Sequence, residues 1–103
     1  MGKEKYYEDR KALFEKLTGR ILDIGCNWGE IHLYLEKKQE CIVYGMDIIL
    51  TNYQDNIVQA DAHHIPFTDE TFDGVFAGEI IEHLENPAQF LREVERVLKR
   101  GGA

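Results

Sequence analysis

The sequence predicts an α/β fold with a parallel sheet, and three observations support this prediction. Short apolar segments alternate with helical segments along the chain, an order typical of parallel strands covered by helices. The stretch ILDIGCNWGEI, residues 21–31, runs from an apolar segment straight into a glycine-bearing turn. Each predicted strand also ends at an acidic residue or a glycine. We therefore expect a ligand site beyond the carboxyl ends of the strands.

The predicted elements alternate in a regular order. An amphipathic helix is expected over residues 4–18, within an N-terminal helical segment (1–19) that precedes the domain proper (20–103). A second helix is expected over residues 28–38. Four apolar segments are predicted as strands: RILDIG (20–25), CIVYGMDI (41–48), NIVQAD (56–61) and FDGVFAG (72–78).

The last predicted helix has clear start and stop signals. Asn86 is a suitable N-cap and Pro87 a suitable first helical residue, since proline lacks the N–H that this position leaves unpaired. Gly101-Gly102 are expected to end the helix. Five apolar residues of this helix fall at helical spacing: Phe90, Leu91, Val94, Val97 and Leu98.

Composition limits the class of partner and the compartment. The chain has 103 residues and a net charge of −7, which argues against electrostatic binding to nucleic acid or to an anionic membrane. No apolar run approaches the roughly 18 to 20 residues that span a bilayer, and the charged N-terminus MGKEKYYEDRK lacks an apolar signal core. With only Cys26 and Cys41, both expected to be reduced, a cytoplasmic location is predicted.

The glycine turn does not fit a phosphate-bearing cofactor. A G-x-G-x-x-G fingerprint starting at Gly25 would need glycines where Asn27 and Glu30 stand, and no Gly-Lys-Ser/Thr follows for a P-loop. Glu30 would also oppose a pyrophosphate at the helix N-terminus. The acids at the strand ends instead suit a cationic, phosphate-free cofactor such as S-adenosylmethionine, because carboxylates attract its sulfonium and ammonium groups.

Several ordered motifs resemble the class I S-adenosylmethionine-dependent methyltransferases. Asp23-x-Gly25-x-Asn27-x-Gly29 is similar to their first motif, D/E-x-G-x-G-x-G, with asparagine at the middle glycine. Residues 59–102, QADAHHIPFTDETFDGVFAGEIIEHLENPAQFLREVERVLKRGG, resemble the small-molecule branch that includes ubiquinone and menaquinone biosynthesis enzymes. The resemblance implies a Rossmann-like methyltransferase three-layer sandwich, truncated after the fourth parallel strand and its following helix.

The resemblance also implies a role for individual residues. Gly25 and Gly29 would let the backbone approach the methionine part of the cofactor, and Asp23 would orient its ammonium group. Asp47 would accept both ribose hydroxyls, and Asp61 the adenine amino group. The complete implied set for S-adenosylmethionine and its product S-adenosylhomocysteine is Asp23, Gly25, Cys26, Asn27, Gly29, Asp47, Ile48, Asp61, Ala62, Gly78 and Glu79. The methyl acceptor is expected to be a small molecule, and no catalytic base is assigned.

The histidines leave one alternative open. His63 and His64 are adjacent and no second pair has metal-ligand spacing, so no metal site is expected. His83 has two interpretations, an exposed helix histidine or a base that faces the substrate.

The resembled family continues beyond residue 102 with further strands, which would leave the fourth strand here at an exposed edge. Such an edge is prone to pairing. We therefore expect a homodimer or a sheet-completing partner chain through this strand. Two further alternatives are a non-catalytic S-adenosylmethionine-binding module and a portion of a longer enzyme.

Overall fold

A computed structural model describes residues 17–25, 37–38, 40–49, 56–78 and 80–102. These residues form four strands, one 3₁₀ helix and one α-helix, which are, in chain order, β1 (Gly19–Ile24), β2 (Cys41–Asp47), β3 (Ile57–Gln59), β4 (Gly74–Ala77), η1 (Ile81–His83) and α3 (Pro87–Val97). The helices predicted over 4–18 and 28–38 lie outside the described residues, apart from Leu17 and Thr18 and from Lys37 and Lys38 at their ends.

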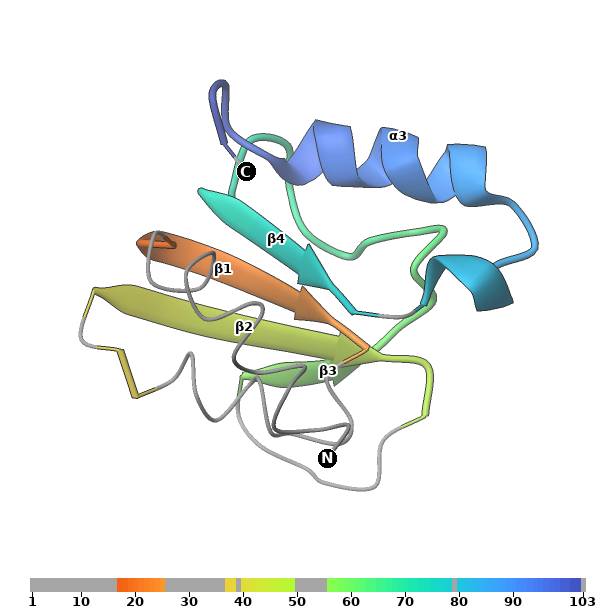
Figure 1. The fold of residues 1–103 in the computed structure, drawn as a ribbon, viewed down its shortest axis with the longest axis horizontal. Helices are drawn as coiled ribbons and strands as arrows, with labels where there is room; N and C mark the ends of the chain where they lie inside the picture. The colour runs from red at the N-terminus through yellow and green to blue at the C-terminus, as the bar shows by residue number, and fades with distance from the viewer. Residues whose placement is uncertain (1–16, 26–36, 39, 50–55, 79, 103) are drawn as a thin grey trace, which may run out of the picture.

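The four strands form one parallel sheet in the order β3-β2-β1-β4, and all of them run in the same direction across Figure 1. The chain therefore steps outward from β1 to β3 and then returns to the opposite side of β1. The register pairs Asp23 of β1 with Gly45 of β2 and with Phe76 of β4. The point where the strand order reverses thus lies between β1 and β4, and ligands of open α/β sheets bind at such a point.

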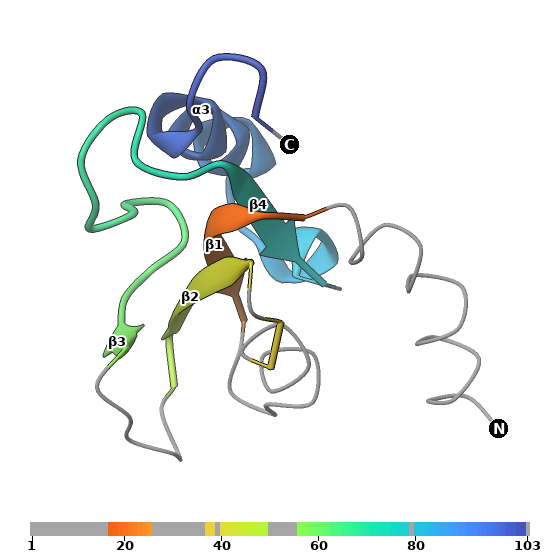
Figure 2. The ribbon, with the colours of Figure 1, turned by 90° about the vertical axis from the view of Figure 1, so that its left-hand side faces the viewer.

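The strands are apolar on both faces, as expected for a parallel sheet. Because successive side chains alternate between the faces, Leu22 and Ile24 of β1 belong to the main core, with Phe72, Phe90 and further buried residues. Ile21 of β1 belongs to a second cluster on the other face. Figure 2 shows α3 and the segment between β3 and β4 on the same side of the strands, and both contribute residues to the main core.

The start of β2 was predicted correctly, and the other boundaries of the four strands were wrong by one or two residues. β1 begins at Gly19, inside the predicted N-terminal segment, because Gly19 N–H already donates to the Glu40 carbonyl at 2.7 Å. β3 ends at Gln59, two residues early, because the chain turns at Asp61. β4 begins at Gly74 rather than at Phe72. Phe72 instead forms a separate bridge to Leu98.

Helix α3 begins as predicted and ends earlier. The Asn86 side chain accepts a hydrogen bond from Gln89 N–H, and Pro87 occupies the first turn. The predicted end at Gly101-Gly102 was wrong, since Leu98 is already extended (ψ 139°). Leu98 leaves the helix because it pairs with Phe72. Of the apolar residues at helical spacing, Leu91 is 54% exposed, since it lies about 100° around the helix from the buried Phe90.

An Arg96–Glu93 pair on α3 holds the segment between β3 and β4 in place. Arg96 donates to the Ile65 and Phe67 carbonyls at 2.8 Å each and to Glu93 at 2.7 Å. Glu93 in turn accepts from Ile65 N–H at 2.8 Å. This pair satisfies backbone groups that burial would otherwise leave without partners. The segment that it holds leads back from β3 to β4.

These contacts predict a loss of stability in acid. The hydrogen bond from Arg96, and after it that from Ile65 N–H, holds the pKa of Glu93 below its ordinary value. A group with a lowered folded pKa contributes stability that is fully present above about pH 5 and is lost as the pH falls from about 4.3 through the folded value. Glu93→Gln is therefore expected to cost about 1 to 2 kcal/mol of unfolding free energy at pH 7 and almost nothing near pH 2.

Urea unfolding at several pH values between 2 and 7 would measure this difference. Glu95→Gln is the matched control, because Glu95 lies on the same helix and is exposed. It should leave the pH dependence nearly unchanged. An equal effect of the two substitutions at pH 7 would contradict the prediction.

Candidate functional site

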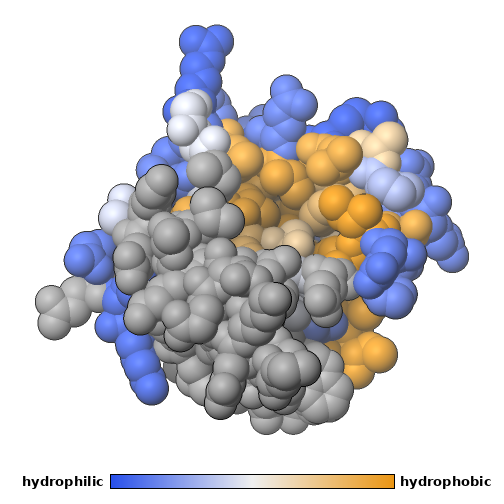
Figure 3. All heavy atoms as spheres, viewed as in Figure 1, coloured by the Kyte–Doolittle hydropathy of each residue, from blue (hydrophilic) through white to orange (hydrophobic). Residues whose placement is uncertain are grey.

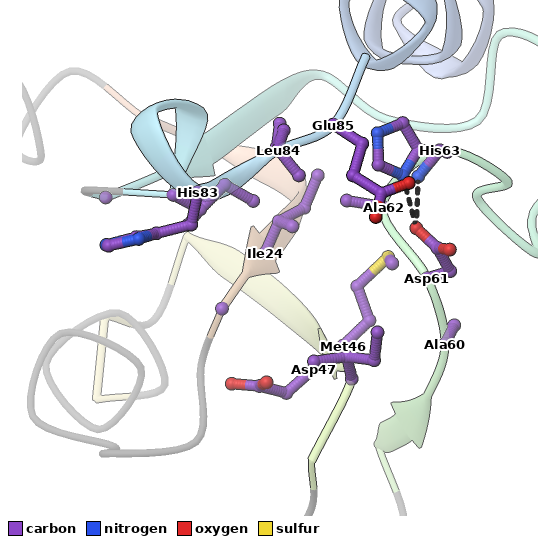
Figure 4. Close-up of a pocket in the computed structure, with 14 residues that line it drawn as sticks. Ile24, Met46, Asp47, Ala60, Asp61, Ala62, His63, His83, Leu84 and Glu85 are labelled. Carbon is purple, nitrogen blue, oxygen red and sulfur yellow. Dashed lines mark hydrogen bonds and ion pairs between the residues drawn. The ribbon is translucent and has the colours of Figure 1, made fainter. Parts of the chain in front are cut away.

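A pocket of about 590 Å³ opens at the carboxyl ends of the strands, within the usual size range of small-molecule sites. Figure 4 shows the residues that line it. They follow the four strands and continue into η1 and the turn before α3: Ile24, Gly25, Met46, Asp47, Ile48, Ala60, Asp61, Ala62, His63, Gly78, Ile80, His83, Leu84 and Glu85. The pocket therefore lies where the strand order predicts a ligand.

Backbone hydrogen bonds hold the carboxyl ends of β1, β2 and β3 next to one another beside this pocket. Gly25 N–H donates to the Met46 carbonyl at 2.8 Å, and Ala60 N–H donates to the Asp47 carbonyl at 3.0 Å. The turns after β1 and β3 are thus tied to the end of β2. Segments more than ten residues apart in the chain present their polar groups to one volume.

Gly25, which directly follows β1, occupies a position where a larger residue would not fit. Its φ is +80°, a left-handed conformation, and an added Cβ would lie 2.9 Å from Cγ2 of Ile80. Both the backbone conformation and the lack of space therefore require glycine. The backbone of this turn is open to close approach by a ligand.

Asp47 and Asp61 are the acids that end β2 and follow β3, and both line the pocket. Asp47 Oδ1 accepts from Ile49 N–H at 3.2 Å, which shapes the turn after β2. Asp61 is half-exposed, and its Oδ1 accepts from both the backbone N–H of His63 at 2.9 Å and the His63 ring at 2.7 Å. The hydrogen bond from His63 N–H, with that from the ring, lowers the pKa of the Asp61 carboxyl. Asp61 is therefore ionised at neutral pH.

The segment after β4 closes the remaining side. Ile80 and Leu84, on either side of η1, pack against the main core and also line the pocket. The His83 side chain is 78% exposed, and its Nε2 lies 3.6 Å from Glu82 Oε1. His83 therefore lies at the open rim of the pocket (Figure 4), which leaves it accessible to a ligand and to solvent.

The charge of the lining selects for a type of ligand. Three carboxylates, those of Asp47, Asp61 and Glu85, line the pocket, and no lysine or arginine is among the described lining residues. Such a set repels a phosphate and attracts a cation or hydrogen-bond donors. Together with the backbone exposed at Gly25, it fits a phosphate-free cofactor that carries positive charge and hydroxyl or amino groups.

The structure brings together most of the predicted site residues that it describes. Gly25, Asp47, Ile48, Asp61, Ala62 and Gly78 all line the pocket. Asp23 does not: the residue is 2% exposed, and strand alternation directs its side chain to the face of Ile21, opposite Ile24. Four predicted residues lie outside the described part of the chain: Cys26, Asn27, Gly29 and Glu79.

Sequence reasoning missed two contributions to the pocket. The first is His63, which was considered only as a metal ligand on a strand, whereas it lies in a turn after β3. An aspartate that binds the N–H two residues later is a common turn signal, and Asp61 could have revealed it. The second is the apolar pair Ile80 and Leu84, which flank η1 and both line the pocket.

A parallel sheet with an acidic pocket at its switch point is the arrangement of an α/β ligand-binding domain. Residues 22–103 match the family model described as "Methyltransferase domain". Because this match covers more than half of the chain, the protein belongs to the methyltransferase domain family. The resemblance inferred from the motifs is confirmed, as is the α/β methyltransferase fold class.

Individual relatives agree with this assignment. The chain is 30% identical over 89% of its length to methyltransferase GfsG of Streptomyces halstedii, of which it covers 40%. It is 33% identical over 90% of its length to demethylmenaquinone methyltransferase of Lactobacillus johnsonii, of which it covers 46%. A solved SAM-dependent methyltransferase of Aquifex aeolicus superimposes with a TM-score of 0.70 at 25% identity, over 89% of this chain and 57% of that one. The chain thus spans about half the length of these relatives.

No helix among the described residues is long and apolar enough to cross a membrane. No group of three or more histidine, cysteine, aspartate or glutamate side chains that could hold a metal ion occurs in the described part of the chain.

Proposed function

We propose that this chain is the cofactor-binding part of an S-adenosylmethionine-dependent methyltransferase that acts on a small molecule. The proposal rests mainly on the pocket. Its carboxylates would repel a phosphate, and it lies at the switch point of the sheet in a chain that belongs to the methyltransferase domain family. The family match favours catalysis over the non-catalytic binding module. The relatives named above, one of which is a demethylmenaquinone methyltransferase, support a small-molecule acceptor.

Different pocket residues would contact different parts of the cofactor. Gly25 would accommodate the methionine part against its exposed backbone, since any side chain there would meet Ile80. Asp47 would accept the ribose hydroxyls, and Asp61, with Ala62 beside it, the adenine amino group. Asp23, Cys26, Asn27, Gly29, Gly78 and Glu79 remain proposed members of the methionine side, by resemblance alone.

In methyl transfer, the main task of the protein would be to position the cofactor and the acceptor. S-adenosylmethionine supplies an activated methyl group when bound, and a direct displacement needs the acceptor in line with it. The carboxylates of Asp47 and Asp61 would orient the nucleoside part. Ile80 and Leu84 would keep water from that side of the pocket. Good alignment alone contributes on the order of 7 to 11 kcal/mol to lowering a reaction barrier.

Calorimetric titration with S-adenosylhomocysteine, S-adenosylmethionine and NAD would test the proposal. We expect saturable binding of the first two and none of NAD, whose pyrophosphate the pocket acids repel. Binding of NAD without S-adenosylhomocysteine would overturn the assignment.

The outer edge of the sheet suggests an assembly. β4 is the last strand in the strand order, and beyond the single bridge from Phe72 to Leu98 no strand pairs with its far side in the described residues. Figure 3 shows hydrophobic residues gathered in the region where β4 runs in Figure 1. We propose that β4 pairs with a strand of a second copy, or of a sheet-completing chain, in the cytoplasm. Sedimentation equilibrium at micromolar concentration tests the homodimer, and a pure monomer would contradict it.

A further inference from the structure

We propose that His63 is a positioning residue that fixes the Asp61 carboxylate and thereby makes the pocket selective for a 6-amino purine. The inference rests on the proposed function, because it assigns Asp61 to the base of the cofactor. His63 itself lines the pocket next to Asp61 (Figure 4). Its role is to hold a neighbouring group in one orientation.

The geometry shows one carboxylate oxygen held twice. Asp61 Oδ1 accepts from His63 N–H at 2.9 Å and is 2.7 Å from His63 Nδ1. Both contacts converge on Oδ1, and no hydrogen bond to Oδ2 occurs within the described residues. The doubly held oxygen restricts rotation of the side-chain torsions, so that Oδ2 is also held in one direction.

The far side of the imidazole determines which nitrogen carries the proton. His63 Nε2 lies 3.1 Å from the backbone N of Asn86, and a backbone N–H can only donate. Nε2 is therefore the acceptor, and the proton of the neutral ring sits on Nδ1, from which it is donated to Asp61. The Asn86 N–H precedes α3, and Gln89 on α3 also donates to the His63 carbonyl at 3.2 Å. The ring is thus held by the N-cap residue of α3 and the His63 carbonyl by the helix itself, so that Nδ1 faces the acid.

Burial makes this arrangement effective. The His63 side chain is 17% exposed, whereas that of Asp61 is 50% exposed. A mostly buried, doubly bonded ring is a rigid support for a carboxylate that would otherwise rotate in solvent. Holding a side chain in its binding conformation before the ligand arrives lowers the entropic cost of binding.

Selectivity follows from the direction in which the fixed oxygen points. An ionised carboxylate accepts from a 6-amino group but repels the 6-oxo group of a hypoxanthine base. A mobile Asp61 could rotate toward the N1–H that hypoxanthine carries and recover a hydrogen bond. An Asp61 held by His63 cannot, so the ring should raise the preference for the amino base.

Two substitutions separate this role from a structural one. In His63→Asn the side-chain amide N–H takes the place of Nδ1 and can still donate to Asp61, but the contact with Asn86 is lost. In His63→Gln the amide oxygen reaches the place of Nε2 and can still accept from Asn86, but the side-chain hydrogen bond to Asp61 is lost. The same change at the adjacent exposed residue, His64→Gln, is the matched control.

The measurement is the ratio of the dissociation constants for S-inosylhomocysteine and S-adenosylhomocysteine, determined by calorimetry on the full chain, with thermal unfolding recorded for each variant. We expect the wild type to prefer the adenosyl compound by at least tenfold. His63→Gln should lower this preference about three- to tenfold, while His63→Asn and His64→Gln should keep it.

Each other outcome has a distinct meaning. If the wild type binds neither compound, the proposed function itself is wrong. If the wild type binds both equally, or if His63→Asn and His63→Gln weaken both compounds to the same extent with the ratio unchanged, the positioning role of His63 is overturned. A variant that unfolds at the assay temperature is measured at a lower temperature, and its ratio of the two dissociation constants is compared with that of the wild type at the same temperature.

Discussion

Replacing Phe72 by alanine is expected to lower the free energy of unfolding by about 3 to 5 kcal/mol, the largest stability effect that we predict. Phe72 is fully buried and forms edge-to-face contacts with Phe67 and Tyr44, with ring centroids 5.1 and 6.0 Å apart. Truncation would remove these contacts and leave a cavity between the sheet and the segment that carries Asp61. Such pairs contribute about 0.5 to 1.5 kcal/mol beyond burial alone.

Equilibrium unfolding in urea, followed by circular dichroism, measures this loss. Leu91→Ala is the control, since it removes a large apolar side chain that is 54% exposed on α3 and should cost less than about 0.5 kcal/mol. Phe72→Leu should fall between the two. A cost below about 1 kcal/mol for Phe72→Ala would show that the main core is not packed around this ring.

Replacing Asp47 by alanine is expected to weaken S-adenosylhomocysteine binding about 100-fold, which equals about 2.7 kcal/mol. Asp47 ends β2 and lines the pocket, and a carboxylate that accepts two ribose hydroxyls makes two charge-assisted hydrogen bonds. Alanine would remove both, together with the contact of Asp47 Oδ1 to Ile49 N–H.

Asp47→Asn removes the negative charge of this side chain but keeps an acceptor for the turn after β2. Its amide oxygen can still accept from Ile49 N–H, so the turn should persist, and the affinity should fall only about tenfold. Glu95→Ala, which removes an exposed acid from α3, controls for the loss of net negative charge. Unchanged affinity in Asp47→Ala, measured by calorimetry on a variant with wild-type unfolding behaviour, would remove Asp47 from the site.

Local signals were enough to predict the order and direction of the elements. Apolar runs bounded by polar residues and glycines predicted β1 to β4, because buried parallel strands need such runs. Asn86 and Pro87 predicted the start of α3, because capping depends on residues next to one another in the chain. The acids Asp47 and Asp61 were predicted to meet, since parallel strands place their carboxyl ends at one edge of the sheet.

Contacts between distant segments decided the rest. α3 ends at Val97 because Leu98 pairs with Phe72, 26 residues away in the chain, a competition that no local stop signal reveals. The Arg96–Glu93 pair holds the segment over residues 65–69 only because that segment packs beside α3. Asp23 could be recognised as part of a motif, but only the alternation along β1 in the folded sheet directs its side chain away from Ile24.

The sequence by itself determined the parallel sheet and the acids that meet at its edge, because these follow from periodicity and from residue types at fixed intervals. The family was indicated by the resemblance of its motifs. Only the tertiary structure decided how His63 is used. Its ring lies between Asp61 and Asn86, which are 25 positions apart, and the donor at Asn86 N determines which imidazole nitrogen faces the acid. A hydrogen-bond chain of this kind depends on packing across the fold, and packing is what a linear pattern does not contain.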